Sequence, residues 1–316
     1  MKKWLYAGAF AVIFAGCVIW AATRRPMART VTIGAVLRAH NSVSLLGEDD
    51  FVTFDILIDT KKSFAGEDCN ITEAYLANDD GEYLKLKVES VEFSGDSLPL
   101  GDNTYYLYYF TFLIDFHPTT EYFFEIADAE LTINYRCGAS VRLPVGSFSY
   151  NKVASFIDDC LSVRKLKGLV NVLDGRKTLA AVDIGIKNDT ESDIFITAIS
   201  PLVPDVAFSF SERVASDALE YRPDCEIDLI LGYAYDYFNG AAAAFNYRLP
   251  AGERACFLLP LKYRRLLPVN KFGIAVDYTI AGESRRLVCD DFTFFKTREI
   301  SLKALQNIEF RTYENY

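Results

Sequence analysis

Hydrophobic and polar residues alternate along much of the chain, and this alternation predicts β-strands. In residues 54–58 every second position is apolar, and residues 182–186 repeat the pattern. Successive side chains of a strand point to opposite faces, so each segment is expected to bury one face and expose the other. Two short apolar runs, residues 112–114 and 257–259, are typical of central strands.

A longer pattern of strand, turn and strand also occurs twice, at residues 133–152 and 276–296. Gly138 of the first copy corresponds to Gly282 of the second, and each is expected to supply the backbone conformation of a hairpin turn. The three repeated segments follow one another in the same order in both halves of the chain. Such order indicates a duplicated domain rather than chance similarity between amphipathic strands.

We therefore predict an all-β protein with two tandem immunoglobulin-like β-sandwich domains, which follow an N-terminal hydrophobic membrane helix or signal peptide. The resemblance to immunoglobulin domains is architectural, because their core tryptophan is missing: Trp4 and Trp20 are the only tryptophans. The expected boundaries are residues 1–29 for the leader or anchor, 30–152 for the first sandwich, 153–166 for a linker and 167–316 for the second sandwich.

Residues 4–22 carry no charge and are flanked by basic residues on both sides. A helix of this length approaches the roughly 30 Å thickness of a bilayer core. Residues 14–17 resemble a bacterial lipoprotein box, in which Cys17 would be lipidated. A cleaved signal peptide, a lipoprotein leader and a retained transmembrane anchor all remain open at this stage.

Charge narrows the range of partners. Five of the 33 basic residues lie in residues 1–29, which leaves 28 against 43 acidic residues, a net charge of about −15. Nucleic acids and anionic lipid headgroups both need clusters of Lys and Arg, so no nucleic-acid partner is expected. The protein should contact the membrane through its N-terminal segment.

The cysteines suggest an oxidising compartment. An even number in the soluble part of an exported chain favours disulfides, and each half of the chain can pair internally. The expected location is the extracytoplasmic face of the cell membrane. The disulfide candidates are Cys69, Cys137, Cys160, Cys225, Cys256 and Cys289.

Tyrosines are concentrated in two places. Tyr233, Tyr235, Tyr237 and Phe238 precede Asn239 and a glycine, a strong hairpin signal, so the three tyrosines are expected on one face of a hairpin. Such a face suits protein or glycan binding, although cross-strand packing inside a sheet is the favoured interpretation of these rings. The first half contains a similar run, made of Tyr105, Tyr106, Tyr108, Tyr109 and Phe110.

Catalytic chemistry finds little support in the sequence. His40 and His117 are the only histidines, and we expect no catalytic residue, metal site or cofactor. Asn70 and Asn188 begin the two N-glycosylation acceptor patterns. We predict a non-catalytic protein that binds another surface protein or a glycan, or that takes part in surface assembly. The alternative is a surface hydrolase accessory or a weak glycosidase that uses carboxylates.

Overall fold

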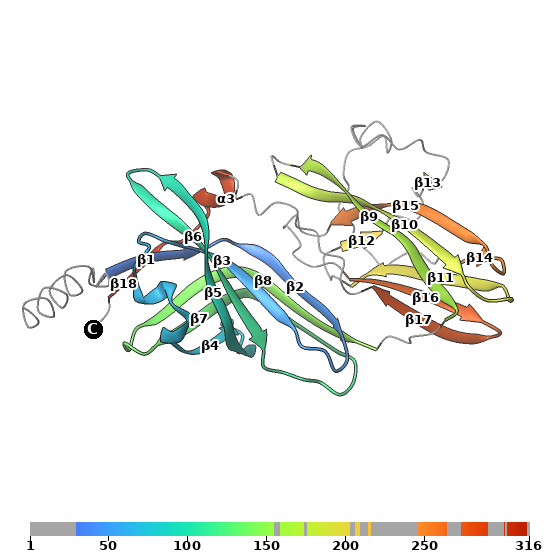
Figure 1. Cartoon of the computed structure of the whole chain (residues 1–316), viewed down its shortest axis with the longest axis horizontal. Helices are drawn as coiled ribbons and strands as arrows, with labels where there is room; N and C mark the ends of the chain where they lie inside the picture. Colours follow the sequence, from blue (N-terminus) through green and yellow to red (C-terminus); the bar gives the residue numbers. More distant parts are fainter. Residues whose placement is uncertain are drawn as a thin grey trace, which may run out of the picture.

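The computed structural model describes residues 30–154, 159–173, 176–202, 206–208, 214–215, 246–263, 273–289, 300 and 302–314. Almost every element within these ranges is a β-strand, and the strands form two separate bodies, at left and right in Figure 1.

The first body is one nine-stranded sheet that folds into two layers, with strand order β18-β1-β3-β6-β5-β4-β7-β8-β2. It also contains two short 3-10 helices, η1 (Phe64–Gly66) and η2 (Asp68–Asn70). The strands are β1 (Thr30–Ala35), β2 (Arg38–Leu45), β3 (Phe51–Ile58), β4 (Ile71–Ala77), β5 (Tyr83–Leu100), β6 (Asn103–Ile114), β7 (Tyr122–Tyr135), β8 (Ser140–Val153) and β18 (Arg311–Glu314).

Strand β5 connects the two layers. It is 18 residues long, pairs with β4 at its start and with β6 along the rest of its length, and its register shifts twice, at Val88/Ser90 and at Phe93/Ser97. Such irregularities bend and twist a strand, which lets one sheet turn over onto itself. The apolar core lies between the layers, with Phe54 and Phe110 from one layer and Leu131 and Val141 from the other.

The second body is a sandwich of two sheets, with strand orders β12-β15-β10-β9, to which β13 adds by pairing with β15, and β14-β11-β16-β17. Its core includes Val182, Ile184 and Ile186 of one sheet and Ile196 and Val276 of the other. The strands are β9 (Leu161–Leu173), β10 (Arg176–Asn188), β11 (Ile194–Pro201), β12 (Val206–Phe208), β13 (Val214–Ala215), β14 (Tyr247–Leu249), β15 (Arg254–Tyr263), β16 (Ile274–Ile280) and β17 (Glu283–Cys289).

The two sandwiches share one pattern of strand pairing. Strand β3 pairs with β6 as β10 pairs with β15, and β4 pairs with β7 as β11 pairs with β16. The hairpins β7-β8 and β16-β17 turn at Gly138 and Gly282, whose φ angles are 87° and 86°. This arrangement matches the two sheets of an immunoglobulin sandwich. The predicted fold class is confirmed.

The alternating segments behave as the sequence indicates. Phe54, Ile56 and Ile58 of β3 are all buried in the first core, as the alternating apolar residues of β10 are in the second. Their burial follows from the period of two, because every second side chain of a strand meets the same face.

Two elements differ from the expected boundaries. Strand β9 begins at Leu161, inside the predicted linker, and β18 belongs to the first sheet rather than to the second sandwich. The register of β18 with β1 places Thr30 opposite Glu314. A four-residue strand carries no sequence signal for its partner, so its location could not be read from the pattern.

The segment before β18 covers the outer face of the first sandwich, where helix α3 (Leu302–Gln306) lies beside β6 in Figure 1. Leu305 and Ile308 pack on Leu57 and Leu107 there. In addition, the rings of Tyr105 and Phe310 stack with their centroids 4.2 Å apart.

The sandwiches touch through a small apolar cluster. Val43 and Val153, from the ends of β2 and β8, pack against Ala275 and Val288 of β16 and β17. The contact is close at Gly273, where an added Cβ would lie 2.6 Å from a Val43 methyl carbon.

Gly34 of β1 permits the close approach of the C-terminal segment, since a Cβ there would lie 2.5 Å from Ile308 Cγ2. We predict that Gly34→Val lowers the free energy of unfolding by about 1–3 kcal/mol through overpacking. The same substitution should cost less in an Ile308→Ala background, because the colliding methyl group is gone. Urea denaturation of the four proteins checks this prediction. An equal cost in both backgrounds would contradict it.

Candidate functional site

Several predicted site residues lie outside the described residues. They are the binding candidates Tyr233, Tyr235, Tyr237 and Phe238, the lipidation candidate Cys17, and Cys225. Their roles stay predictions. Across the part of the chain that the structure describes, no helix is long and apolar enough to cross a membrane, and residues 1–29 are not in that part.

No disulfide joins the cysteines that the structure describes, so the predicted bridges are not formed among them. Cys256 lies beside Gly185 on the outer face of its sheet, whereas Cys160 and Cys289 pack against the core. The Arg285 guanidinium donates a hydrogen bond to the Cys160 sulfur at 3.2 Å.

The aromatic run of the first half is used mainly for packing. Tyr108 is buried and its hydroxyl donates to the Lys61 carbonyl at 3.0 Å, while Phe110 lies in the core. The Lys61 ammonium also lies 5.0 Å from the centroid of the Tyr106 ring. For these residues the structure favours cross-strand packing over an exposed binding face.

A pocket of about 340 Å³ opens where the two sandwiches meet. We call it the junction pocket. It is lined by Glu121 and Ala154 of the first sandwich and by Thr197, Asp277, Tyr278, Ser284, Arg285 and Arg286 of the second.

Arg286 organises the charge of the junction pocket. It lies opposite Asp277 in the β16-β17 register and donates to both carboxylate oxygens, at 2.6 and 3.3 Å. On its other side it forms an ion pair with Glu121 at 3.8 Å, which bridges the two sandwiches. The hydrogen bond to Asp277 raises the pKa of the guanidinium, and the charge of Glu121 adds to this effect.

Two exposed aromatic residues lie close in sequence to residues that line the junction pocket. Tyr122 follows Glu121 directly, is 36% exposed, and lies with its ring centroid 4.9 Å from that of Phe116. The backbone of Phe116 is held by the Tyr150 hydroxyl, which donates to its carbonyl at 3.1 Å. Phe195 is 40% exposed and shares the outer face of β11 with Thr197 of the pocket, two positions away.

Two carboxylates of the junction pocket, from Glu121 and Asp277, contact the same guanidinium. Because both carboxylates are ion-paired with Arg286, they are arranged to hold its guanidinium in place rather than to transfer a proton. Among the described residues, no group of three or more His, Cys, Asp or Glu side chains is arranged to hold a metal ion.

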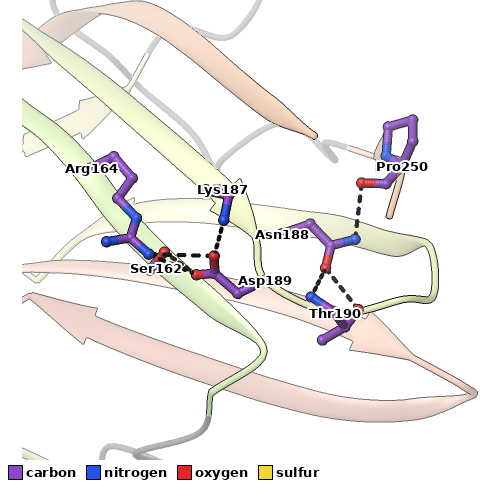
Figure 2. Close-up of polar contacts among 7 residues, drawn as sticks. All are labelled: Ser162, Arg164, Lys187, Asn188, Asp189, Thr190 and Pro250. Carbon is purple, nitrogen blue, oxygen red and sulfur yellow. Dashed lines mark hydrogen bonds and ion pairs between the residues drawn. The ribbon is translucent and has the colours of Figure 1, made fainter. Parts of the chain in front are cut away.

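A second polar cluster surrounds Asp189 after the end of β10 (Figure 2). Its carboxylate accepts hydrogen bonds from Ser162, Arg164 and Lys187. The hydrogen bonds from Lys187 and Ser162 are the main reason that the pKa of Asp189 is lowered to about 2. These partners come from β9 and β10, so the cluster joins two neighbouring strands.

Asn188, beside this cluster, is fully buried. Its Nδ2 donates to the carbonyls of Ser192, Leu249 and Pro250, and its Oδ1 accepts from both the backbone and the hydroxyl of Thr190. Figure 2 shows the contacts to Thr190 and Pro250. An amide engaged in this way is closed to a glycosyl donor, so Asn188 is a structural residue in this fold although it matches the acceptor pattern.

The first sandwich contains buried ionic contacts that the sequence did not indicate. The Lys152 ammonium lies 2.8 Å from an Asp50 oxygen, with both side chains at most 2% exposed, and Ser42 and Ser44 donate to the same carboxylate. Their depth assigns them to structure rather than to ligand binding, because no solvent reaches them.

His40 is buried between these contacts, with its ring 4.6 Å from that of Phe54. Burial lowers the pKa of His40 to about 3, and the nearby charge of Arg38 adds to the shift. Arg38 is itself held by Asp55, whose Oδ2 accepts from the guanidinium at 3.0 and 2.5 Å.

Comparisons with known proteins leave the family open. No protein-family model and no curated protein matches the chain. Among solved structures, similarity is found to titin domains Z1Z2 in complex with telethonin, with 8% identity over 86% of this chain and 100% of that chain and a TM-score of 0.20. The C-terminal domain of the Streptococcus agalactiae AgI/II polypeptide BspA is 11% identical over 82% and 99% of the two chains, with a TM-score of 0.19.

A protein of unknown function from Porphyromonas gingivalis W83 is 8% identical over 82% of this chain and 99% of that chain, with a TM-score of 0.21. At such identities and TM-scores, the similarities say nothing about ligand or activity.

We predict that His40 makes the protein less stable as the pH falls. Between pH 6.5 and about 3 the unfolded chain binds a proton at this residue and the folded chain does not, so stability decreases on acidification, by at most about 1.4 kcal/mol per pH unit. Urea denaturation between pH 7 and pH 4 measures the slope. His40→Gln should make the slope shallower, whereas the same change at the exposed His117 should not. Identical slopes for all three proteins would disprove the prediction.

Proposed function

We propose that the protein is a membrane-anchored, extracytoplasmic and non-catalytic binding protein, and that its partner is another surface protein. The observation that carries the proposal is the junction pocket, a recess lined mostly by polar and charged side chains where two immunoglobulin-like sandwiches meet. Arg286 of the pocket is proposed to meet the partner, together with the exposed residues Tyr122 and Phe195, which lie one and two positions from the lining residues Glu121 and Thr197.

The composition of this surface supports protein binding. Tyr, Phe and Arg are enriched in protein interfaces, and anchor residues are most effective where a pocket excludes water around them. Because the lining pairs two guanidinium groups, of Arg285 and Arg286, with two carboxylates, of Glu121 and Asp277, the pocket can receive a partner's polar groups without leaving an uncompensated charge. The aromatic rings add apolar area at small entropic cost.

A carboxylate-based glycosidase is the less favoured function. Such enzymes place two carboxyl groups on either side of the scissile bond, and one of them must carry a proton. In the junction pocket the corresponding carboxylates are both occupied by Arg286. No described contact supports proton transfer there.

Photo-crosslinking tests the proposed surface. A photoreactive phenylalanine analogue in place of Tyr122 or Phe195, in the full chain expressed in its native cells, is expected to give a discrete higher-mass adduct with a partner protein on irradiation. The matched control is Tyr83, which is 52% exposed on the first sandwich and does not line the junction pocket. It should give no such adduct.

Three other outcomes of this crosslinking experiment would change the proposal. An equal yield from Tyr83 would show nonspecific capture and contradict the proposal. An adduct from Tyr235 alone would move the binding surface to the hairpin predicted from the sequence. Retention on a glycan, with no protein adduct at any position, would show that the partner is a glycan and not a surface protein.

The proposed membrane anchor depends on residues 1–29. The acidic balance of the rest of the chain disfavours anionic lipid surfaces, so attachment is assigned to the apolar stretch of residues 4–22. Both a lipidated Cys17 and a retained span fit this proposal.

We predict that the protein fractionates with membranes and is released only by detergent. Its intact mass should correspond either to a chain that begins at an acylated Cys17 or to the complete chain. Deletion of residues 1–22 should leave the protein in the soluble fraction. Recovery of the unmodified full chain from the soluble fraction would disprove the anchor.

A further inference from the structure

A lysine and a carboxylate meet in the dry interior of the first sandwich. The Lys152 ammonium, near the end of β8, lies 2.8 Å from Oδ2 of Asp50, the residue just before β3. Both side chains are at most 2% exposed. Taking two ions out of water carries a large free-energy cost, which their mutual attraction repays only in favourable geometry. A reaction between the two groups that removes both charges would also remove this cost.

Three acceptors fix the orientation of the Lys152 nitrogen. Besides contacting Asp50, it donates to the backbone carbonyl of Leu45, at 3.0 Å, and to that of Glu48. If one proton moves from the ammonium to Asp50, the amine keeps two N–H bonds, which the two carbonyls hold, and a lone pair directed at the carboxyl group. The dry surroundings favour this transfer, because it eliminates two buried charges. The nitrogen is then a nucleophile that faces a carboxylic acid.

Asp50 is held in place for attack at its carboxyl carbon. Ser44 donates to Oδ2 at 2.7 Å, the oxygen that also contacts the lysine nitrogen, and Ser42 donates to Oδ1 at 3.1 Å. Oδ2 is one bond away from Cγ, so the nitrogen lies close to the separation of about 3–3.5 Å at which reacting atoms are poised. The Ser42 hydroxyl can stabilise the negative charge that develops on Oδ1 during the attack.

We propose that Lys152 and Asp50 join through an intramolecular amide bond. The nitrogen attacks Cγ, a tetrahedral intermediate forms, and Oδ2 leaves as water with two protons that both come from the lysine nitrogen. A carbon–nitrogen bond replaces one carbon–oxygen bond, so no oxidant or other co-reactant is needed. The remaining amide N–H can donate to the Glu48 carbonyl, while the Leu45 carbonyl keeps the Glu48 backbone amide as its donor, at 3.2 Å.

The bond closes a covalent loop around most of the first sandwich. The loop has about 100 residues and contains β3 to β7 and most of β8, so it restricts the unfolded chain strongly. Unlike an ion pair, an amide persists at low pH, at high salt and in denaturant. The inference is independent of the proposed binding function, because it rests on contacts within the first sandwich alone.

Peptide mapping of the purified full-length protein in detergent tests the bond. We expect a branched peptide that joins Asp50 to Lys152, is lighter by about 18 Da than its two parts together, and survives boiling in denaturant. The matched internal control is the ion pair of Lys165 with Asp183, at 2.6 Å, whose lysine side chain is 23% exposed and therefore reached by water. These two residues should occur only in unlinked peptides.

Lys152→Arg keeps the positive charge and removes the nucleophilic amine, because a guanidinium stays protonated. The branched peptide should be lost in this variant, and its intact mass should show no missing water, which is about 18 Da. A mass deficit that persists in the variant would come from a reaction elsewhere in the chain and would contradict the proposal. If the variant does not fold, the digest of the unaltered protein still decides.

Three findings in that digest would overturn the proposal. The first is recovery of Asp50 and Lys152 in separate peptides only. The second is equal linkage of Lys165 to Asp183, which would show nonselective condensation. The third is a link that joins two chains. Loss of binding to a partner protein, or loss of membrane attachment, would leave the branched peptide unchanged, so failure of the proposed function is distinguishable from failure of this inference.

Discussion

Buried charge constrains the first sandwich more than any other interaction. Lys152 and Arg38 are both nearly inaccessible to water, and a cation in such a place is tolerated only with a carboxylate at hydrogen-bonding distance. Asp50, just before β3, and Asp55, in the middle of β3, meet this requirement. Ser42 and Ser44 of β2 and Lys152 of β8 all contact the Asp50 carboxylate, so charge compensation supports the parallel β2-β8 pair as well as apolar burial.

That placement shapes the junction between the sandwiches. Because β2 and β8 run side by side, Val43 and Val153 reach the second sandwich together, and both pack there on Ala275 and Val288. The ion pair between Glu121 and Arg286 forms next to this apolar contact. The junction pocket is thus a consequence of how the first sandwich is closed, and its geometry is supported by contacts from both bodies.

The sequence predicted what depends on local pattern and missed what depends on distant partners. Alternation identified β3 and β10, and glycine identified the turns at Gly138 and Gly282, because these features are encoded within a few residues. Strand β2 was not predicted from the alternation of apolar and polar residues, because its inward side chains are polar. Strand β18 is too short to indicate that its partner lies at the other end of the chain. Glu121 and Arg286 are also far apart in sequence, so only the fold brings the pocket together. For the aromatic run around Tyr108 the sequence left an exposed face open beside the favoured cross-strand packing, because alternation alone does not distinguish a ring packed across strands from an exposed one.

The pairing of β1 with β18 has a topological consequence. Thr30 and Glu314 face each other across two hydrogen-bonded strands, so the ends of the described chain lie side by side on the first sandwich. A short peptide linker between them would make the backbone cyclic, and new ends could then be opened at an exposed turn such as the one at Gly101. In this sense the order of residues along the chain is one of several circular permutations compatible with the same arrangement of strands.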